Sequence, residues 1–198
     1  MISLGCVEAC NGDGGGSSSY LSKREGENAL TKRSRNSDGI ERETSMALLI
    51  VNKAPDSNVF DHASMAPEND YITPGSDVAI NAIGVSSAGT AAEIPEDISW
   101  QMADASCGSV ENDVFTSNGT LGDAVVQMVY GGNVVGEATV HVAVPDRMEF
   151  EQDQMTIPFG KRAPLTMHAY SGNAEVALKG SDVNFVFSEP SIGTLPVL

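Results

Sequence analysis

Apolar and polar residues alternate along four short stretches in the middle of this 198-residue chain. The stretches are Asp77–Ile83, Ile98–Met102, Ala124–Tyr130 and Ala138–Val144. Successive side chains of a β-strand point to opposite faces, so a period of two is typical of strands with one buried face. Gly131-Gly132-Asn133 joins the last two stretches like a hairpin turn. Short strands with regular turns predict a mainly β chain that folds as a β-sandwich.

The order of residues around these strands resembles bacterial immunoglobulin-like domains. The markers are Pro74-Gly75, Ile98-Ser99-Trp100, Gly108, Phe115-Thr116, Gly119 and the closing strand Ala138–Val142. The resemblance implies an immunoglobulin-like β-sandwich over residues 54–145. Trp100 is then expected in the core, because a lone tryptophan in an alternating strand more often packs than binds.

A second copy of this pattern begins after Pro145. Asp146–Phe150 restarts a strand, Ile157–Gly160 parallels Ile72–Gly75, and Asp182–Phe185 parallels Asp97–Trp100. The period is about 85 residues, which fits tandem modules rather than a short solenoid repeat. We therefore expect residues 146–198 to form an incomplete second sandwich with an exposed edge.

The amino-terminal part carries a glycine-rich run, Asn11-Gly12-Asp13-Gly14-Gly15-Gly16-Ser17-Ser18-Ser19. Successive glycines leave backbone N–H groups uncovered by side chains, so such a loop can wrap around an anion. It is not a P-loop, because the required lysine and its spacing are absent. By composition alone, a flexible linker is the favoured interpretation.

The residues around this run resemble the carboxyl-terminal end of the phosphodiester glycosidase family. The resemblance covers Leu4–Ala9, Asp13–Ser18, Ser37–Arg42 and Ala47–Val51, with Gly12 where the family usually has a leucine. The family includes the N-acetylglucosamine-1-phosphodiester alpha-N-acetylglucosaminidase type of enzyme. The resemblance implies that residues 1–53 are the last strands of a mixed α/β catalytic domain.

The same resemblance implies roles for individual residues. Asp13 is the candidate for acid/base or metal-ligand work, and the substrate phosphate or sugar would meet the backbone of Gly14, Gly15 and Gly16. The remaining candidate substrate-binding residues are Asn11, Ser17, Ser18 and Arg42. Arg42 could grip a phosphate with two N–H groups, or it could form a surface ion pair with Glu41 or Glu43. Glycosidases generally need a second carboxylate, and none is identified, so we expect the chain by itself to be inactive.

Local patterns in this part predict short strands. We expect strands at Ile2–Cys10, Ser18–Ser22 and Met46–Val51, because the first and last are apolar runs too short for helices. Lys23–Asp38 is polar and charged, which predicts a loop or hairpin on the surface.

The charge of the chain limits its partners. Between Ala54 and Asp146 there is no lysine or arginine and there are fourteen acidic residues, against a net charge of −16 for the whole chain. Such a surface repels nucleic acid and anionic lipid and is typical of a secreted or cell-surface protein. Calcium binding by Asp97 and Asp104 lacks the usual loop pattern, and the sequence identifies no cofactor. No apolar run is long enough to span a membrane.

Cysteine and histidine add little. Cys6 and Cys10 do not form a C-x-x-C pair, and Cys107 is expected to be a buried thiol. His62, His141 and His168 are too scattered to predict a metal cluster, and we expect His141 at the surface or in a structural role.

Two functions follow from the sequence. The first is an exported glycosidase that hydrolyses a sugar 1-phosphate diester, with a glycan or sugar-phosphodiester substrate and immunoglobulin-like accessory modules. Cell-wall polysaccharide is a further candidate partner of these modules. The alternative is a non-catalytic cell-surface adhesion or spacer protein built from immunoglobulin-like repeats, in which the glycine-rich run is a linker.

Overall fold

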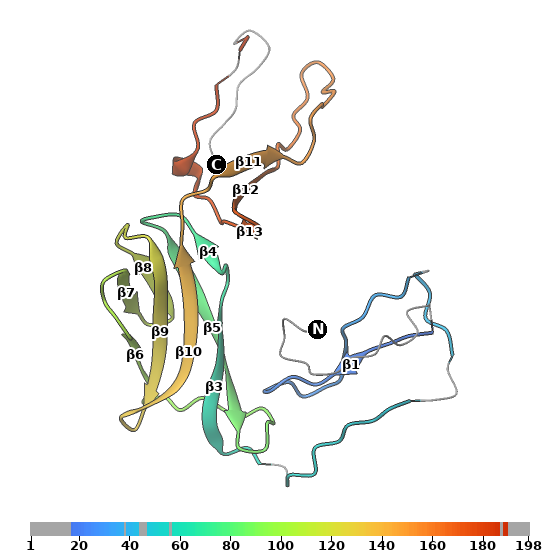
Figure 1. Ribbon diagram of the computed structural model, residues 1–198, viewed down its shortest axis with the longest axis vertical. Helices are drawn as coiled ribbons and strands as arrows, with labels where there is room; N and C mark the ends of the chain where they lie inside the picture. Colours follow the sequence, from blue (N-terminus) through green and yellow to red (C-terminus); the bar gives the residue numbers. More distant parts are fainter. Residues whose placement is uncertain (1–16, 38, 44–46, 56, 187, 190–198) are drawn as a thin grey trace.

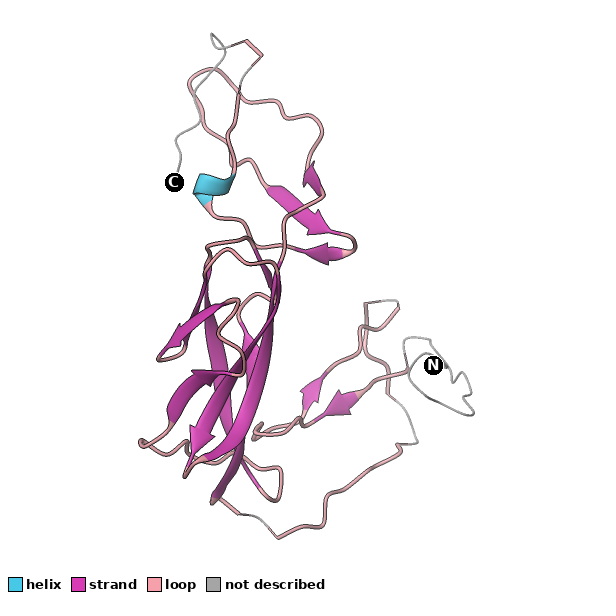
Figure 2. Cartoon of the chain, turned by 60° about the vertical axis from the view of Figure 1, so that its left-hand side comes forward, coloured by secondary structure: helices cyan, strands magenta, loops and turns pink. Residues whose placement is uncertain are grey.

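A computed structural model describes residues 17–37, 39–43, 47–55, 57–186 and 188–189. The regular secondary structure of these residues is almost entirely strand (Figure 2), and their helical content is limited to one short 3-10 turn. The prediction of a mainly β chain is confirmed. No mixed α/β unit is seen among the described residues of the segment 1–53.

Two four-stranded sheets form a β-sandwich between residues 60 and 142 (Figure 1). One sheet has the order β3 (Phe60–Pro67), β5 (Asp77–Ser86), β8 (Val114–Ser117), β7 (Gly108–Glu111). The other has the order β4 (Tyr71–Ile72), β10 (Asn133–Val142), β9 (Gly122–Tyr130), β6 (Ser99–Met102). All neighbours are antiparallel except β4 and β10, which run parallel. In chain order this is the A-B-E-D and G-F-C arrangement of immunoglobulin-like sandwiches.

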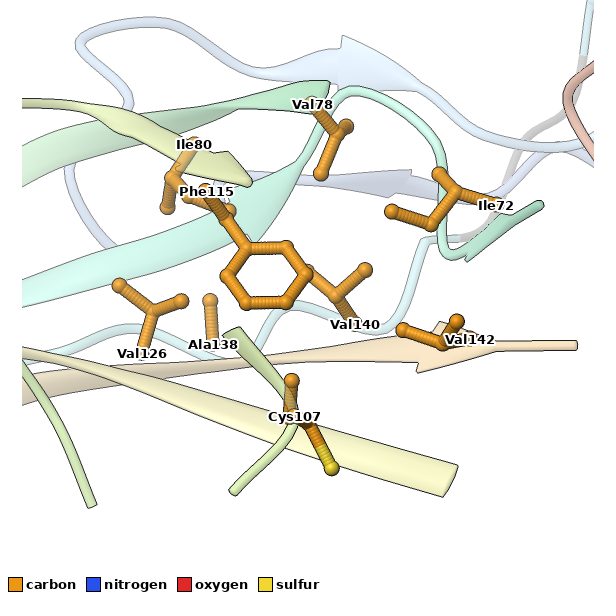
Figure 3. Packing of buried hydrophobic residues seen from close by; sticks show 10 residues of the cluster. Ile72, Val78, Ile80, Cys107, Phe115, Val126, Ala138, Val140 and Val142 are labelled. Carbon is orange, nitrogen blue, oxygen red and sulfur yellow. The ribbon is translucent and has the colours of Figure 1, made fainter. Parts of the chain in front are cut away.

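The inward residues of both sheets pack into one core (Figure 3). The ring of Phe115 lies between Ile80 on one sheet and Val140 on the other, and all three side chains are at most 2% exposed. Trp100, which the sequence predicts in the core, packs against this cluster but is partly exposed, and Cys107 is a buried free thiol within it. No lysine or arginine lies on any strand of the sandwich.

Glycines are needed at two places, in the turn that leads into β10 and within β10 where it packs on β3. Gly131 and Gly132 form the two-residue turn from β9, with φ values of +56° and +79°, which fits the type I′ hairpin turn. Gly136 lies against β3 of the other sheet, where an added Cβ would be 2.6 Å from Met65 Sδ and 3.1 Å from Ala63 Cβ. The two sheets therefore approach closely where β10 crosses β3.

A three-stranded sheet follows the sandwich, formed by β11 (Arg147–Phe150), β12 (Met167–Ser171) and β13 (Ala174–Glu175). The Cα partners Arg147↔Tyr170 and Phe150↔Met167 of β11 and β12 lie 85 positions after the partners His62↔Val85 and Met65↔Ala82 of β3 and β5. The two pairs between them, Met148↔Ala169 and Glu149↔His168, keep the same offset. The β3–β5 and β11–β12 ladders therefore pair in the same register.

The turn before the second strand of each ladder is also the same. Ser76 N donates to Thr73 O at 3.1 Å and Lys161 N donates to Pro158 O at 3.0 Å. The third residue of each turn is a glycine, Gly75 or Gly160, with φ of +73° or +75°. A glycine with positive φ at this place is the signature of a type II turn.

The later part of the second copy differs from the first. Asp182–Phe185 corresponds to the start of β6 by sequence, but here the turn η2 (Gly180–Asp182) and irregular chain occupy these residues. A strand at an exposed position needs a neighbouring strand to pair with, and local sequence does not supply one.

The amino-terminal segment forms a small hairpin. β1 (Leu21–Ser22) pairs with β2 (Thr31–Lys32), which confirms a short strand within Ser18–Ser22 and a hairpin within Lys23–Asp38. The predicted strand at Met46–Val51 is wrong for its described residues, since residues 47–51 are irregular and Leu48 and Ile50 are almost fully exposed. The predicted strand Ile2–Cys10 lies outside the described residues.

Candidate functional site

The glycine-rich site predicted from sequence falls mostly outside the described residues. Asn11, Asp13 and Gly14–Gly16 are not among the described residues, so the geometry of this loop stays a prediction. Ser17, Ser18 and Arg42 are described and lie at the two ends of the amino-terminal hairpin segment, where each makes contacts.

A polar network joins the two ends of this segment. Asn36 Nδ2 donates to Ser18 O and Ser19 Oγ, both at 3.4 Å. Ser19 Oγ donates to Glu41 Oε1 at 3.0 Å, and Lys32 Nζ lies 3.3 Å from Glu41 Oε2. The hydrogen bond from Ser19, followed by that from Lys32, lowers the pKa of Glu41. These bonds hold the two ends of the segment together, with the carboxylate of Glu41 ionised.

The loop of the hairpin is fixed in a similar way. Arg33 Nη2 donates to both carboxylate oxygens of Glu27, and Arg24 N donates to Glu27 Oε2 at 2.9 Å. The hydrogen bond from Arg33, with that from the Arg24 backbone, lowers the pKa of Glu27. The charged clusters around Glu41 and Glu27 therefore stabilise the hairpin itself.

The tip of the hairpin docks on the outer face of the sandwich. Gly26 is buried with φ of +76°, and its N–H donates to Gly89 O at 3.3 Å. Beside it, His62 lies between Asp61 Oδ2, 2.9 Å from Nδ1, and Glu25 Oε2, 3.5 Å from Nε2. The hydrogen bond to Asp61, helped by Glu25, raises the pKa of His62.

The sandwich and the β11–β12–β13 sheet meet at a junction of backbone and side-chain bonds. Ala177 N donates to Tyr71 O at 2.8 Å, which adds this segment to the edge of β4. Thr73, which is buried, donates from Oγ1 to Asp182 Oδ2 at 2.5 Å, and Lys179 Nζ donates to Gly75 O. Residues more than a hundred positions apart in sequence therefore fix the two units together.

A groove of about 640 Å³ opens beside this junction. Its walls come from residues 67–71 on one side, and from Met167, Ala169 and residues 174–178 on the other. Glu175 in its wall binds His168, with Oε1 2.6 Å from Nδ1, and this bond raises the pKa of His168. The groove combines acids with small apolar side chains and does not assemble a nucleophile with a base.

His141 lies close to this groove. Its Nδ1 is 2.6 Å from Asp123 Oδ1, and its ring stacks on Tyr71 with centroids 4.4 Å apart. These contacts give His141 a structural role at the surface, as the sequence predicted.

The described part of the chain contains no group of three or more His, Cys, Asp or Glu residues placed to hold a metal ion. Asp104 instead accepts a hydrogen bond from Ser106 N at 2.9 Å, which shapes its own loop. Within the same residues, no helix is long and apolar enough to cross a membrane.

The junction residues Thr73, Lys179 and Asp182 were not predicted as a site. The sequence marks Thr73-Pro74-Gly75 as a turn and Asp182 as a counterpart of Asp97, but a pattern of local residues does not show which distant segments meet.

Comparisons with known proteins give little further information. No protein-family model matches the chain, and no curated protein matches it with significance. Among solved structures, it is similar to one of FdeC, described as a broadly conserved Escherichia coli adhesin eliciting protection against urinary tract infections. The identity is 12% over 52% of this chain, with a TM-score of 0.35, and the chain spans 38% of that protein's chain. The resemblance of residues 4–51 to the phosphodiester glycosidase family has no support in these comparisons, and the fold rests on the strand order described above.

Proposed function

We propose that this chain is a non-catalytic cell-surface protein in which immunoglobulin-like β-sandwich modules act as adhesion or spacer units. The observation that carries the proposal is the common register of the β3–β5 and β11–β12 ladders, offset by 85 residues. Together with the shared turn at Gly75 and Gly160, it supports two copies of one module, over residues 54–145 and 146–198.

The path of the chain supports a spacer. In Figure 1 the chain enters the sandwich at the start of β3, at the lower end, and leaves from β10 at the upper end, where β11 begins. A module with its entry and exit at opposite ends extends the chain in one direction when it is repeated.

The junction supports the same function. Ala177 N bonds to Tyr71 O at 2.8 Å and Ala143 N bonds to Ile72 O at 3.0 Å, so backbone bonds hold β4 from both sides. Modules joined by such bonds keep a defined direction, which is useful in a protein that carries a binding part away from a surface.

We propose a secreted or cell-surface location together with this function. The outer faces of the sandwich carry acids without lysine or arginine, which suits a solvated exported module and opposes binding to nucleic acid. A polysaccharide partner remains a prediction from the resemblance, because no contact among the described residues indicates one.

The glycosidase function stays a prediction that the described residues do not favour. Of its candidate residues, Ser18 is held by Asn36, and Glu41, one of the two acids adjacent to Arg42, is bound by Ser19 and Lys32. Incubating the chain with a sugar 1-phosphodiester tests it directly. We expect no release of sugar, and a release that Asp13→Asn abolishes would replace our proposal with the enzyme.

Antibodies against residues 54–145 test the location. We expect them to label intact cells of the organism that encodes the chain, with a known internal protein as the unlabelled control. Labelling that requires permeabilised cells would contradict a role as a surface adhesion or spacer unit.

A further inference from the structure

The β11–β12 ladder has one apolar and one polar face. Paired residues in a ladder point to the same side, and the pairs Met148↔Ala169 and Phe150↔Met167 form the apolar side. We call these four residues the β11–β12 apolar face. The opposite side carries Arg147, Glu149, His168 and Tyr170.

The common register identifies the counterpart of this face in the complete sandwich. At an offset of 85, Met148 and Phe150 correspond to Ala63 and Met65 on β3, and Met167 and Ala169 correspond to Ala82 and Gly84 on β5. In the complete sandwich β10 covers this place, since Gly136 packs directly on Ala63 and Met65.

The two faces differ in what covers them. Ala63 is 6% exposed, whereas Met148 is 51% exposed and Phe150 is 47% exposed. The same contrast holds beyond the ladder, where Ile72 and Ile80 are buried but their counterparts Ile157 and Leu165 are more than 40% exposed. On β11 and in the segment 151–166, apolar residues at core positions of the repeat are thus open to solvent, whereas on β12 Met167 is half-buried and Ala169 is buried.

We infer that the β11–β12 apolar face is a docking surface for a β-sheet of the kind that contains β9 and β10, with these two strands supplied in cis on the carboxyl-terminal side. This inference rests on the proposed tandem modules. In the complete sandwich three strands of the covering sheet, β6, β9 and β10, follow β5 in the same chain, and the repeat assigns the same order to the second module.

The chemistry of the covering sheet follows from the first module. Met148 and Phe150 are larger than Ala63 and Met65, so the strand that crosses them must carry small residues, as β10 does at Gly136 and Ala138. Its remaining inward positions are valine-rich, as on β9 and β10.

The length of the strands agrees with an uncovered face. β3 and β5 have 8 and 10 residues, whereas β11 and β12 have 4 and 5. Most counterparts of the missing strand residues, at positions 151–152 and 162–166, lie in the irregular segment 151–166, which contains Ile157 and Leu165. Covering the face would extend both strands into this segment.

The repeat offers a direct test. Leu198 corresponds to Asp113 at the 85-residue offset, so a second copy of Val114–Pro145 appended after Leu198 places β8, β9 and β10 in register without altering the chain. We expect amide hydrogen exchange in β11 and β12 to slow at least tenfold, and exchange in residues 151–166 to slow as well.

The matched control carries Val126→Asp and Val140→Asp in the appended copy only. Both valines are fully buried in the sandwich, so the aspartates should prevent docking while the length and composition stay nearly unchanged. Exchange in β11 and β12 of the control should match that of the unextended chain.

Equal exchange in the extended chain and its control would overturn the inference. Slowed exchange in the unextended chain that rises with protein concentration, with dimers in light scattering, would also overturn it, since a second copy would then cover the face. Either result leaves the antibody test of the proposed function unaffected, and failure of that test leaves the exchange result readable.

Discussion

Gly26 ties the amino-terminal hairpin to the sandwich. With φ of +76°, it adopts a left-handed conformation, and an added Cβ would lie 2.5 Å from Ile83 Cγ2. We predict that Gly26→Ala releases the hairpin tip, because it adds a clash to the roughly 1–2 kcal/mol of backbone strain. Trypsin cleavage after Lys23 and Arg24 should become several times faster.

Gly39 provides the matched control for this change. It has φ of +72° but no atom within 4 Å of an added Cβ, so Gly39→Ala introduces the backbone strain without the clash. Similar cleavage rates in the two variants would show that the contact with Ile83 does not hold the hairpin.

His62 should make this docking depend on pH. Asp61 and Glu25 raise the pKa of His62 above its ordinary value of 6.5. Asp61 neighbours His62 on β3 whether or not the hairpin is docked, so only the contact with Glu25 links this pKa to docking. The stabilisation from Glu25 is therefore present while His62 is protonated in both states, and it is lost as pH rises through the higher pKa of the docked state. We predict slower hairpin cleavage at pH 5.5 than at pH 8, after calibration of the protease on a reference peptide.

The variant His62→Gln should lose most of this pH dependence, whereas His141→Gln, which alters a pair far from the hairpin, should keep it. A profile of His62→Gln identical to that of the unaltered chain would assign the dependence to another group.

At the scale of the element, the core centres on Phe115 of β8. Its ring is fully buried between the two sheets, so Phe115→Ala leaves a cavity as well as losing buried area. We predict a loss of about 3–5 kcal/mol in the free energy of unfolding. Urea titration followed by Trp100 fluorescence measures it, and Leu121→Ala, at an exposed position, should change it by less than about 0.5 kcal/mol. An equal midpoint in both variants would place the core elsewhere.

The strands that sequence predicted well are those whose own pattern is regular. β5, β6, β9 and β10 alternate apolar and polar residues, and each has a buried side in the sandwich. The apolar residues of β3, Phe60, Ala63, Met65 and Ala66, do not alternate regularly. It is a strand because β5 pairs with it and β10 packs on it. Residues 47–51 show the reverse, since strong β propensity without a partner strand gave an exposed irregular segment.

For the whole molecule, the junction decides whether the two units move together. Thr73 Oγ1 donates to Asp182 Oδ2, and Thr73→Val removes this donor at nearly constant volume. We predict a broader distribution of maximum dimensions in small-angle X-ray scattering. The urea midpoint of the sandwich should fall modestly, because Thr73 Oγ1 also hydrogen-bonds to the buried Ser76 Oγ at 2.7 Å. Thr139→Val, an exposed change on β10, is the control and should leave the scattering as it is. Scattering curves of the two variants that superpose would mean that the remaining bonds, from Ala177 N and Lys179 Nζ, fix the junction without Thr73.

This junction is also where sequence reasoning reached its limit. The repeat of about 85 residues could be found from short matches along the chain, because each copy has the same local turn and strand order. The contact of Thr73 with Asp182 spans 109 positions and depends on how the copies pack, which no local pattern encodes. The glycine-rich loop around Asp13 remains the untested part of the sequence prediction.

The sandwich without lysine or arginine on its strands has a practical consequence. Amine-reactive reagents find no primary amine between Ala54 and Asp146, so they couple the chain through its flanks, at side chains such as Lys53 and Lys161. A sensor chip prepared by carbodiimide coupling would therefore present the whole sandwich surface uncoupled, and ligands that bind it could be screened without loss of epitopes.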